Sequence, residues 1–125
     1  MFVRAGFGNG GIEATAFTDI DQTLPAGFSA TGKRWGRPED TVGLAAAVNG
    51  VSSIHQAFFN AGGLGLLVGD GKLPNYGNEK IIEIYYSLPV FSWRATLDYQ
   101  FITNPAYNRD RGPVSVIGTR LRAQF

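Results

Sequence analysis

The sequence predicts an all-β chain that forms an antiparallel transmembrane β-barrel segment, with about seven strands and one short helix in a long loop. Three observations favour this class. Apolar and polar residues alternate over most of the 125 residues, 17 glycines and 13% aromatic residues suit short strands joined by turns, and only 17% of the residues are charged. No stretch approaches the roughly 18 apolar residues of a membrane-spanning helix. A membrane protein of this sequence therefore has to cross with alternating strands of about ten residues.

Composition excludes several classes of partner and site. The formal net charge is +1 and no run of lysines or arginines offers a surface for phosphates, so no nucleic acid partner is expected. The absence of cysteine rules out disulfides, thiolate metal ligands and a thiol nucleophile. Residues 1–6 lack a basic segment followed by an apolar run, so they are not a secretory signal. If the protein is exported, we expect further sequence upstream.

The first third of the chain is predicted to contain three strands. Residues 2–7 are typical of the end of a strand, and the glycines at 8–11 indicate a tight connection. Alternation then predicts a strand over residues 12–19, although Phe17 interrupts its polar face, and a clearer one over residues 23–33. In this last strand every second residue from Leu24 is apolar.

The middle of the chain predicts one strand and one helix. In the strand over residues 41–49, apolar residues from Val42 onward alternate with small or polar residues, which leave space on their face. Ser53 has capping-box spacing to Gln56, apolar residues follow at helical spacing, and Gly62 is placed to end the helix. This helix lies in a connection over residues 50–78, far longer than the usual hairpin loop of about 2–5 residues. Such a loop is usually functional or covers something.

Three strands with one apolar and one polar face are predicted at the C-terminal end. They cover residues 81–88, 95–104 and 113–125. Their polar faces share six side chains with charged, amide or phenol groups: Glu83, Tyr85, Asp98, Gln100, Arg120 and Arg122. If the chain crosses a membrane, this face has to line the lumen because only the opposite face is apolar enough for lipid. Mixed carboxylates, guanidinium groups and aromatic rings suit hydroxyl-rich solutes such as sugars, although each residue could instead only hydrate and brace the wall.

The connections are predicted to alternate between short and long. Short ones fall at residues 8–11, 34–39 and 90–93 and long ones at 50–78 and 104–112, while the short link near 19–22 is an exception. Three aromatic residues gather on the short-connection side, as in an interfacial girdle or at a capped edge of a soluble sheet: Trp35, Phe91 and Trp93.

Motifs for phosphate binding, metals or catalysis do not stand up. The run from Gly6 to Gly11 matches G-x-G-x-x-G, but an alternating segment follows it instead of a helix, so we interpret it as a hairpin turn. The glycine-rich stretch 62–71 lacks the Lys-Ser/Thr ending of a phosphate loop and is more typical of a close-packed loop.

The titratable residues likewise suggest no enzyme. His55 is the only histidine and is expected on the surface of the loop helix. The carboxylate pairs Asp19 with Asp21 and Glu39 with Asp40 are expected to be solvated turn residues. The sequence therefore predicts no enzyme, no metal site and no cofactor.

Four segments agree in order and spacing with one known family. They are RWGRPEDTVGLA at 34–45, GGLGLLVGDG at 62–71, NYGNEKIIEIYYSLP at 75–89 and LDYQFITNPAYNRDRGPVSVIGTRLRAQF at 97–125. On these segments the chain resembles the carbohydrate-selective, OprB-type porins. The resemblance implies a sixteen-stranded barrel in the bacterial outer membrane, monomeric or associating as a trimer, that admits glucose and related sugars by facilitated diffusion. Residues 1–125 would be the C-terminal part of a single porin barrel domain.

The resemblance also implies the partners of the chain. They would be sugars as solutes, outer-membrane lipid, the barrel-assembly machinery, and either further copies or the remaining strands of the barrel. Phe125 resembles the aromatic C-terminal residue of the outer-membrane assembly signal and is assigned to the membrane interface. Two alternatives stay open: a general or anion-preferring porin, suggested by Arg120 and Arg122, and a soluble all-β binding module.

Overall fold

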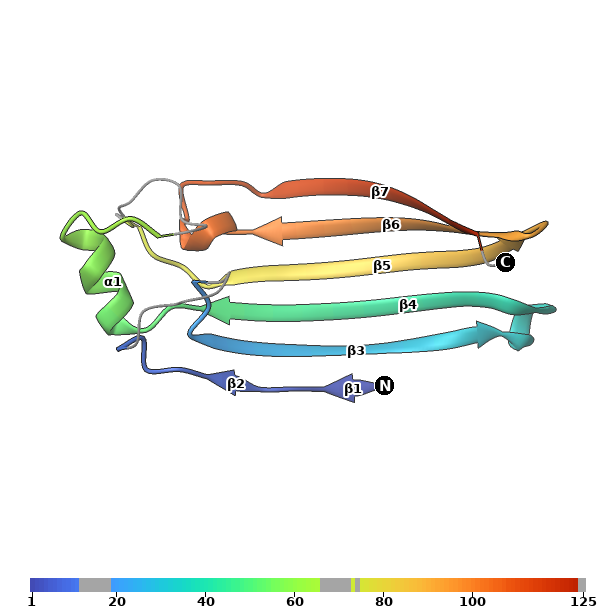
Figure 1. Cartoon of the computed structure of the whole chain (residues 1–125), viewed down its shortest axis with the longest axis horizontal. Helices are drawn as coiled ribbons and strands as arrows, with labels where there is room; N and C mark the ends of the chain where they lie inside the picture. Colours follow the sequence, from blue (N-terminus) through green and yellow to red (C-terminus); the bar gives the residue numbers. More distant parts are fainter. Residues whose placement is uncertain (12–18, 66–72, 74, 124–125) are drawn as a thin grey trace.

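The computed structural model describes residues 1–11, 19–65, 73 and 75–123. They form one antiparallel sheet in which each long strand pairs with the next along the chain, in the order β1-β3-β4-β5-β6-β7, with β2 also paired to β3 (Figure 1). The sheet is open, with β1 and β2 at one edge and β7 at the other. The elements are β1 (Phe2–Val3), β2 (Gly6–Phe7), β3 (Gln22–Gly32), η1 (Lys33–Trp35), β4 (Arg37–Gly50), α1 (Ser53–Asn60), β5 (Glu79–Val90), β6 (Trp93–Thr103), η2 (Pro105–Tyr107) and β7 (Val114–Ala123). The all-β antiparallel class, the long strands and the single α-helix in a long loop are confirmed.

The two ends of the sheet differ. At the turn end, β3 and β4 are joined through η1 and Gly36, and β5 and β6 through residues 91–92. At the loop end lie α1, η2 and the longer connections (Figure 1). Gly36 and Phe91 both have positive φ, 75° and 54°, which tightens the two short turns. The predicted alternation of short and long connections is confirmed for these four links.

The N-terminal strands depart from the prediction. β1 and β2 pair directly with β3, with Phe2 opposite Gly27 and Gly6 opposite Thr23. The Gly8 amide donates to the Asp21 carbonyl at 2.5 Å, so the segment 8–21 joins neighbouring strands at the loop end. The prediction of a tight turn at residues 8–11, at the turn end of the sheet, was wrong. Pairing with a distant strand outweighs the local turn preference of glycine. The strand predicted over residues 12–19 falls mainly on residues 12–18, which lie outside the described residues.

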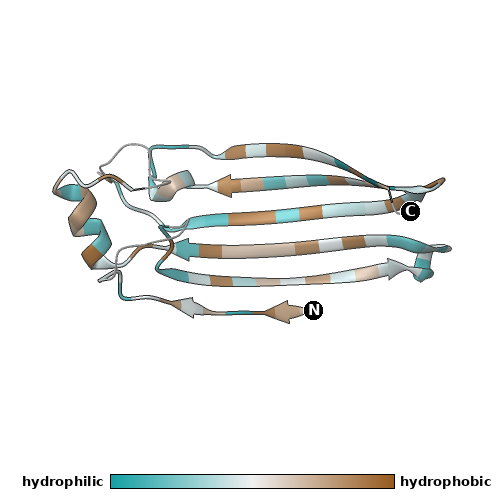
Figure 2. Cartoon of the chain, viewed as in Figure 1, coloured by the Kyte–Doolittle hydropathy of each residue, from teal (hydrophilic) through white to brown (hydrophobic). Residues whose placement is uncertain are grey.

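The two faces of the sheet have different chemistry. Hydrophobic and hydrophilic residues succeed one another along the long strands (Figure 2), as a period of two requires. On the apolar face the side chains of β7 are uncovered, with Ile117 74% and Leu121 71% exposed. Leu24, Leu44, Ile84 and Leu97 are also exposed on this face. No other layer packs on it among the described residues.

A small hydrophobic core sits at the loop end instead. It consists of Val51, Phe59, Leu73 and Tyr107, with Ile20 and Tyr76 packed against it. Phe59 is fully buried and comes from α1, so burying this side chain fixes the helix over the end of the sheet. No helix among the described residues is long and apolar enough to cross a membrane.

The helix begins one residue earlier than its sequence signature. The side chain of Ser52, not Ser53, accepts a hydrogen bond from the His55 amide at 3.2 Å and is the N-cap. Gln56 donates to the Val51 carbonyl at 3.0 Å. At the other end Gly62 has φ 96°, as predicted for a glycine that ends a helix.

Candidate functional site

The polar face of β5, β6 and β7 brings the six predicted polar residues together. The register pairs Glu83 with Gln100 and Tyr85 with Asp98, and it places Arg120 opposite Thr96 and Arg122 opposite Arg94. Residues that face each other directly in an antiparallel pair project to the same side. All six therefore lie on one face, which we call the polar face.

The middle of the polar face carries hydrogen-bonded and close-packed side chains. The Gln100 amide donates to Glu83 at 3.0 Å, so the two side chains are joined across β5 and β6. The ring of Tyr85 lies across Gly43, where any Cβ would overlap it, and the Asp98 carboxylate lies over Gly118 in the same way. The glycines thus provide the floor on which a ring and a carboxylate rest.

A second row of polar side chains crosses the sheet near the loop end. Thr23 donates to Asn49 at 2.7 Å, and Asn49 donates to Glu79 at 3.3 Å. Glu79 also accepts from the Ala106 amide at 3.1 Å, which ties the row to η2. Glu79 was missed because the predicted strand began at Ile81. Extending its alternation by one step would have found it.

Arg94 is the other polar-face residue that the sequence analysis missed. It lies directly opposite Arg122, in the pair that follows Trp93 and Ala123 along β6 and β7. Its guanidinium group donates to the Glu39 carbonyl at 3.2 Å and to the Ser87 hydroxyl at 3.4 Å. The predicted strand began at Ala95, so Arg94 was not recognised as a residue on the same face as Thr96.

The predicted aromatic residues lie together at the turn end. Trp35 belongs to η1, Phe91 is fully exposed between β5 and β6, and Trp93 begins β6. The Trp35 indole donates to the Tyr86 hydroxyl at 3.2 Å, so it lies on the side of the sheet that carries Tyr86 and the apolar residues next to it. Phe125, the fourth predicted interface residue, lies outside the described residues.

Asp40 binds Tyr86 at the turn end and is not the solvated turn residue that we expected. It is 2% exposed and accepts from the Tyr86 hydroxyl and, at 2.5 Å, from Arg37. An ionised carboxylate can be buried here because a cation and a phenol both bind it. Its sequence neighbour Glu39 is exposed, as expected.

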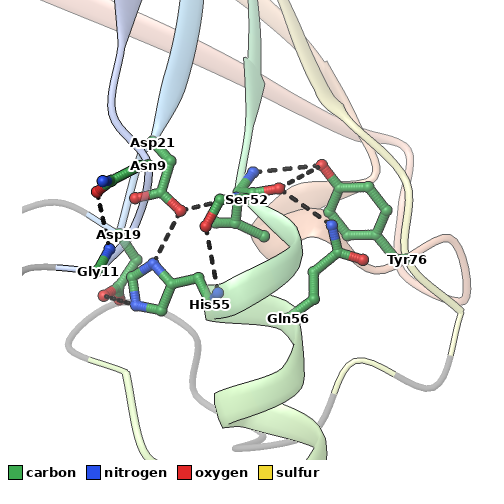
Figure 3. A network of polar contacts seen from close by, with 9 residues as sticks. Asn9, Gly11, Asp19, Asp21, Ser52, His55, Gln56 and Tyr76 are labelled. Atoms are coloured by element: carbon green, nitrogen blue, oxygen red, sulfur yellow. Dashed lines mark hydrogen bonds and ion pairs between the residues drawn. The ribbon is translucent and has the colours of Figure 1, made fainter.

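At the loop end, Asp19, Asp21 and His55 form a buried polar network (Figure 3), which corrects the prediction that these residues are solvated. The Asp21 carboxylate accepts from the Ser52 amide at 2.7 Å and lies 3.0 Å from His55 Nδ1. Asp19 is 3.8 Å from the other ring nitrogen, and the imidazole stacks on Phe59 at 4.9 Å. The His55 side chain is only 14% exposed. Hydrophobic packing of α1 has drawn all three residues inward.

Hydrogen bonding sets the ionisation of Asp21. Burial alone raises the pKa of this carboxyl, but the hydrogen bonds from the amide and hydroxyl of Ser52 and the contact with His55 outweigh burial. The pKa therefore lies below its ordinary 3.8. Burial also raises the pKa of the neighbouring Tyr107, which stays protonated. The network thus holds an ionised carboxylate that anchors α1 to the start of β3.

The described residues contain no group of three or more histidine, cysteine or acidic side chains that could hold a metal ion. The Ser52 hydroxyl accepts from the His55 backbone, and the imidazole faces the two aspartates. This arrangement caps and anchors a helix and presents no nucleophile with an adjacent base.

Comparison with known proteins identifies one family. The family model for the carbohydrate-selective porin, OprB family, matches residues 1–125, the whole of the chain. No curated protein and no solved structure matches the chain. The open sheet, with one polar and one apolar face, is what part of a β-barrel porin requires. The chain therefore belongs to the OprB family of carbohydrate-selective outer-membrane porins.

Proposed function

We propose that these strands form part of the wall of a water-filled barrel in the bacterial outer membrane, through which glucose and related sugars diffuse passively. The observation that carries the proposal is the division of the sheet into a polar face and an uncovered apolar face, in a member of this porin family. Residues 1–125 would then be one part of a single barrel domain, completed by further strands at the two open edges.

The apolar face supports an assignment to lipid. Ile117, Leu121 and Leu97 are more than half exposed and stand on neighbouring strands. A soluble binding module would leave this surface in water, whereas the hydrocarbon of a membrane covers it favourably. The opposite face then lines the lumen.

The middle of the polar face supports sugars as solutes. Glu83 and Asp98 offer carboxylate oxygens to hydroxyl donors, and Arg120 donates to hydroxyl oxygens. Between them the Tyr85 ring, held flat over Gly43, provides a surface for the apolar face of a sugar ring. A solute that exchanges water for these contacts can pass without a strong electrostatic barrier.

The two ends of the sheet support an orientation. Trp35, Phe91 and Trp93 at the turn end suit a membrane interface, and short turns are the periplasmic feature of such barrels. The loop end with α1 would then face outward. Assembly by the barrel-assembly machinery and association with further copies are part of the same proposal.

Liposome swelling with the complete barrel that contains these strands tests the function. We expect glucose to enter faster than a charged solute of similar size, and Tyr85→Ala to reduce this preference because the ring surface is lost. Ile82→Ala on the apolar face is the matched control and should leave the preference unchanged. Equal rates for both solutes would contradict sugar selectivity, and faster entry of anions would favour the anion-preferring porin suggested by Arg120 and Arg122.

A further inference from the structure

The charges on the polar face of β5, β6 and β7 are sorted along the strands. Three carboxylates occupy the loop half and the middle, and three guanidinium groups occupy the turn half. In register order from the loop end these residues are Glu79, Glu83, Asp98, Arg120, and then Arg94 with Arg122.

The arginines of the turn-side arginine cluster, Arg94, Arg120 and Arg122, form no ion pair, although Arg94 interacts at longer range with Asp40, which Arg37 already binds. Arg94 donates only to neutral oxygens, the Glu39 carbonyl and the Ser87 hydroxyl. Within the described residues, no carboxylate lies within ion-pair distance of any of the three. Arg120 and Arg122 are exposed, so their donors remain available to a solute.

The register adds an electrostatic strain to this cluster. Arg94 and Arg122 are direct cross-strand partners, and like charges in that position repel each other. Arg37, at the start of β4, is different because Asp40 neutralises it at 2.5 Å. A bound anion would neutralise Arg94 and Arg122, as Asp40 neutralises Arg37.

We propose that the turn-side arginine cluster is a binding site for small solutes that carry a carboxylate or phosphate group. The proposal rests on the lumenal position of the polar face. Guanidinium groups bind such oxyanions with paired hydrogen bonds. The carboxylates of the loop half repel anions, so an anion reaches the cluster more easily from the turn side. Lipid headgroups are not the occupant, because Leu97 and Leu121, the lipid-facing residues of β6 and β7, stand on the opposite face.

Ion conductance of the complete barrel in planar bilayers tests the site, with inorganic phosphate as the probe. We expect phosphate to reduce the current at lower concentration from the turn side than from the loop side. The double substitution Arg94→Gln and Arg122→Gln should raise the half-blocking concentration by about tenfold, since each arginine contributes charge-assisted hydrogen bonds. Ser92→Cys, labelled with an impermeant maleimide, marks the turn side in a chain without cysteine.

Arg34→Gln is the matched control, because it removes one charge at the same end from η1, outside the strands. It should leave the half-blocking concentration unchanged. Equal block from both sides, or block that the double substitution does not weaken, overturns the site. Loss of phosphate block when phosphatidylglycerol is added to a phosphatidylcholine bilayer would identify a lipid headgroup as the occupant and overturn it too.

Sugar swelling measured on the same variants separates the two proposals. If glucose selectivity persists while phosphate has no effect, only the anion site is wrong. If phosphate block is sided and arginine-dependent while glucose shows no preference, only the sugar function is wrong.

Discussion

Gly43 and Tyr85 form a pair in which the lack of a side chain at Gly43 makes room for the aromatic ring of Tyr85. The register places them side by side on β4 and β5, and any side chain at position 43 would overlap the ring. The sequence indicated open space on this face of β4, but only the register shows which ring fills it. The shape of the polar face therefore depends on a pairing between residues that are 42 positions apart in the chain.

Gly43→Ala should destabilise the barrel by about 1 kcal/mol or more, because the new methyl group displaces the Tyr85 ring. In a Tyr85→Ala background the same change should be neutral or stabilising, since alanine loses less backbone entropy than glycine in a strand. Urea unfolding of the four proteins of this double-mutant cycle measures the coupling. Additive effects would show that ring and glycine are independent.

The network around Asp21 predicts a dependence of loop stability on pH. The pKa of Asp21 is lower in the folded chain than its ordinary 3.8, so this carboxylate stabilises the folded loop fully above that value. The stabilisation is lost as the pH falls below 3.8 toward the folded pKa. Hydrogen exchange of the Ser52 amide, corrected for its intrinsic rate, should therefore accelerate in acid. Asp21→Asn should remove this acceleration, and an unchanged pH profile in that variant would exclude Asp21 as its cause.

At the scale of the element, α1 is held by its N-cap, by one buried side chain and by the contact of His55 with Asp21. Ser52 caps the helix and Phe59 joins the core at the loop end, while the helix presents Ile54 and Phe58 to the outside. Burial of one side chain is not enough to stabilise a helix of eight residues, because short helices are marginal in water. The N-cap therefore contributes a large share of the stability of α1.

Ser52→Ala should destabilise α1 by about 1 kcal/mol, the usual effect of losing a serine N-cap. Protection of the His55 amide against hydrogen exchange reports this change directly, since that amide donates to Ser52. Ser53→Ala is the matched control, because Ser53 is exposed and neighbours the cap. An equal loss of protection in both variants would contradict the assignment of Ser52 as the N-cap.

At the scale of the whole molecule, the sequence predicted what a local period can encode. Alternation identified the long strands and both of their faces, because a residue's side of a sheet follows from its position along one strand. It could not give register, so the opposition of Arg94 and Arg122 was invisible. It also misplaced the connection after Gly8, where pairing with Asp21 decides the path of the chain. The His55 network was missed because Asp21, which binds the imidazole, lies 34 residues away in the chain.

The contacts at the loop end have a mechanical consequence for the barrel rim. Asp21 before β3 binds Ser52 after β4, the Tyr76 hydroxyl before β5 accepts from the Val51 amide, and Tyr76 stacks on Tyr107 after β6. These links form a transverse brace over four consecutive strands. At the turn end the two hairpins are also joined, because Trp35 and Asp40 bind Tyr86, and Arg94 donates to the Glu39 carbonyl. Under a pulling force, the two hairpins should therefore resist sliding past one another at both ends of the sheet.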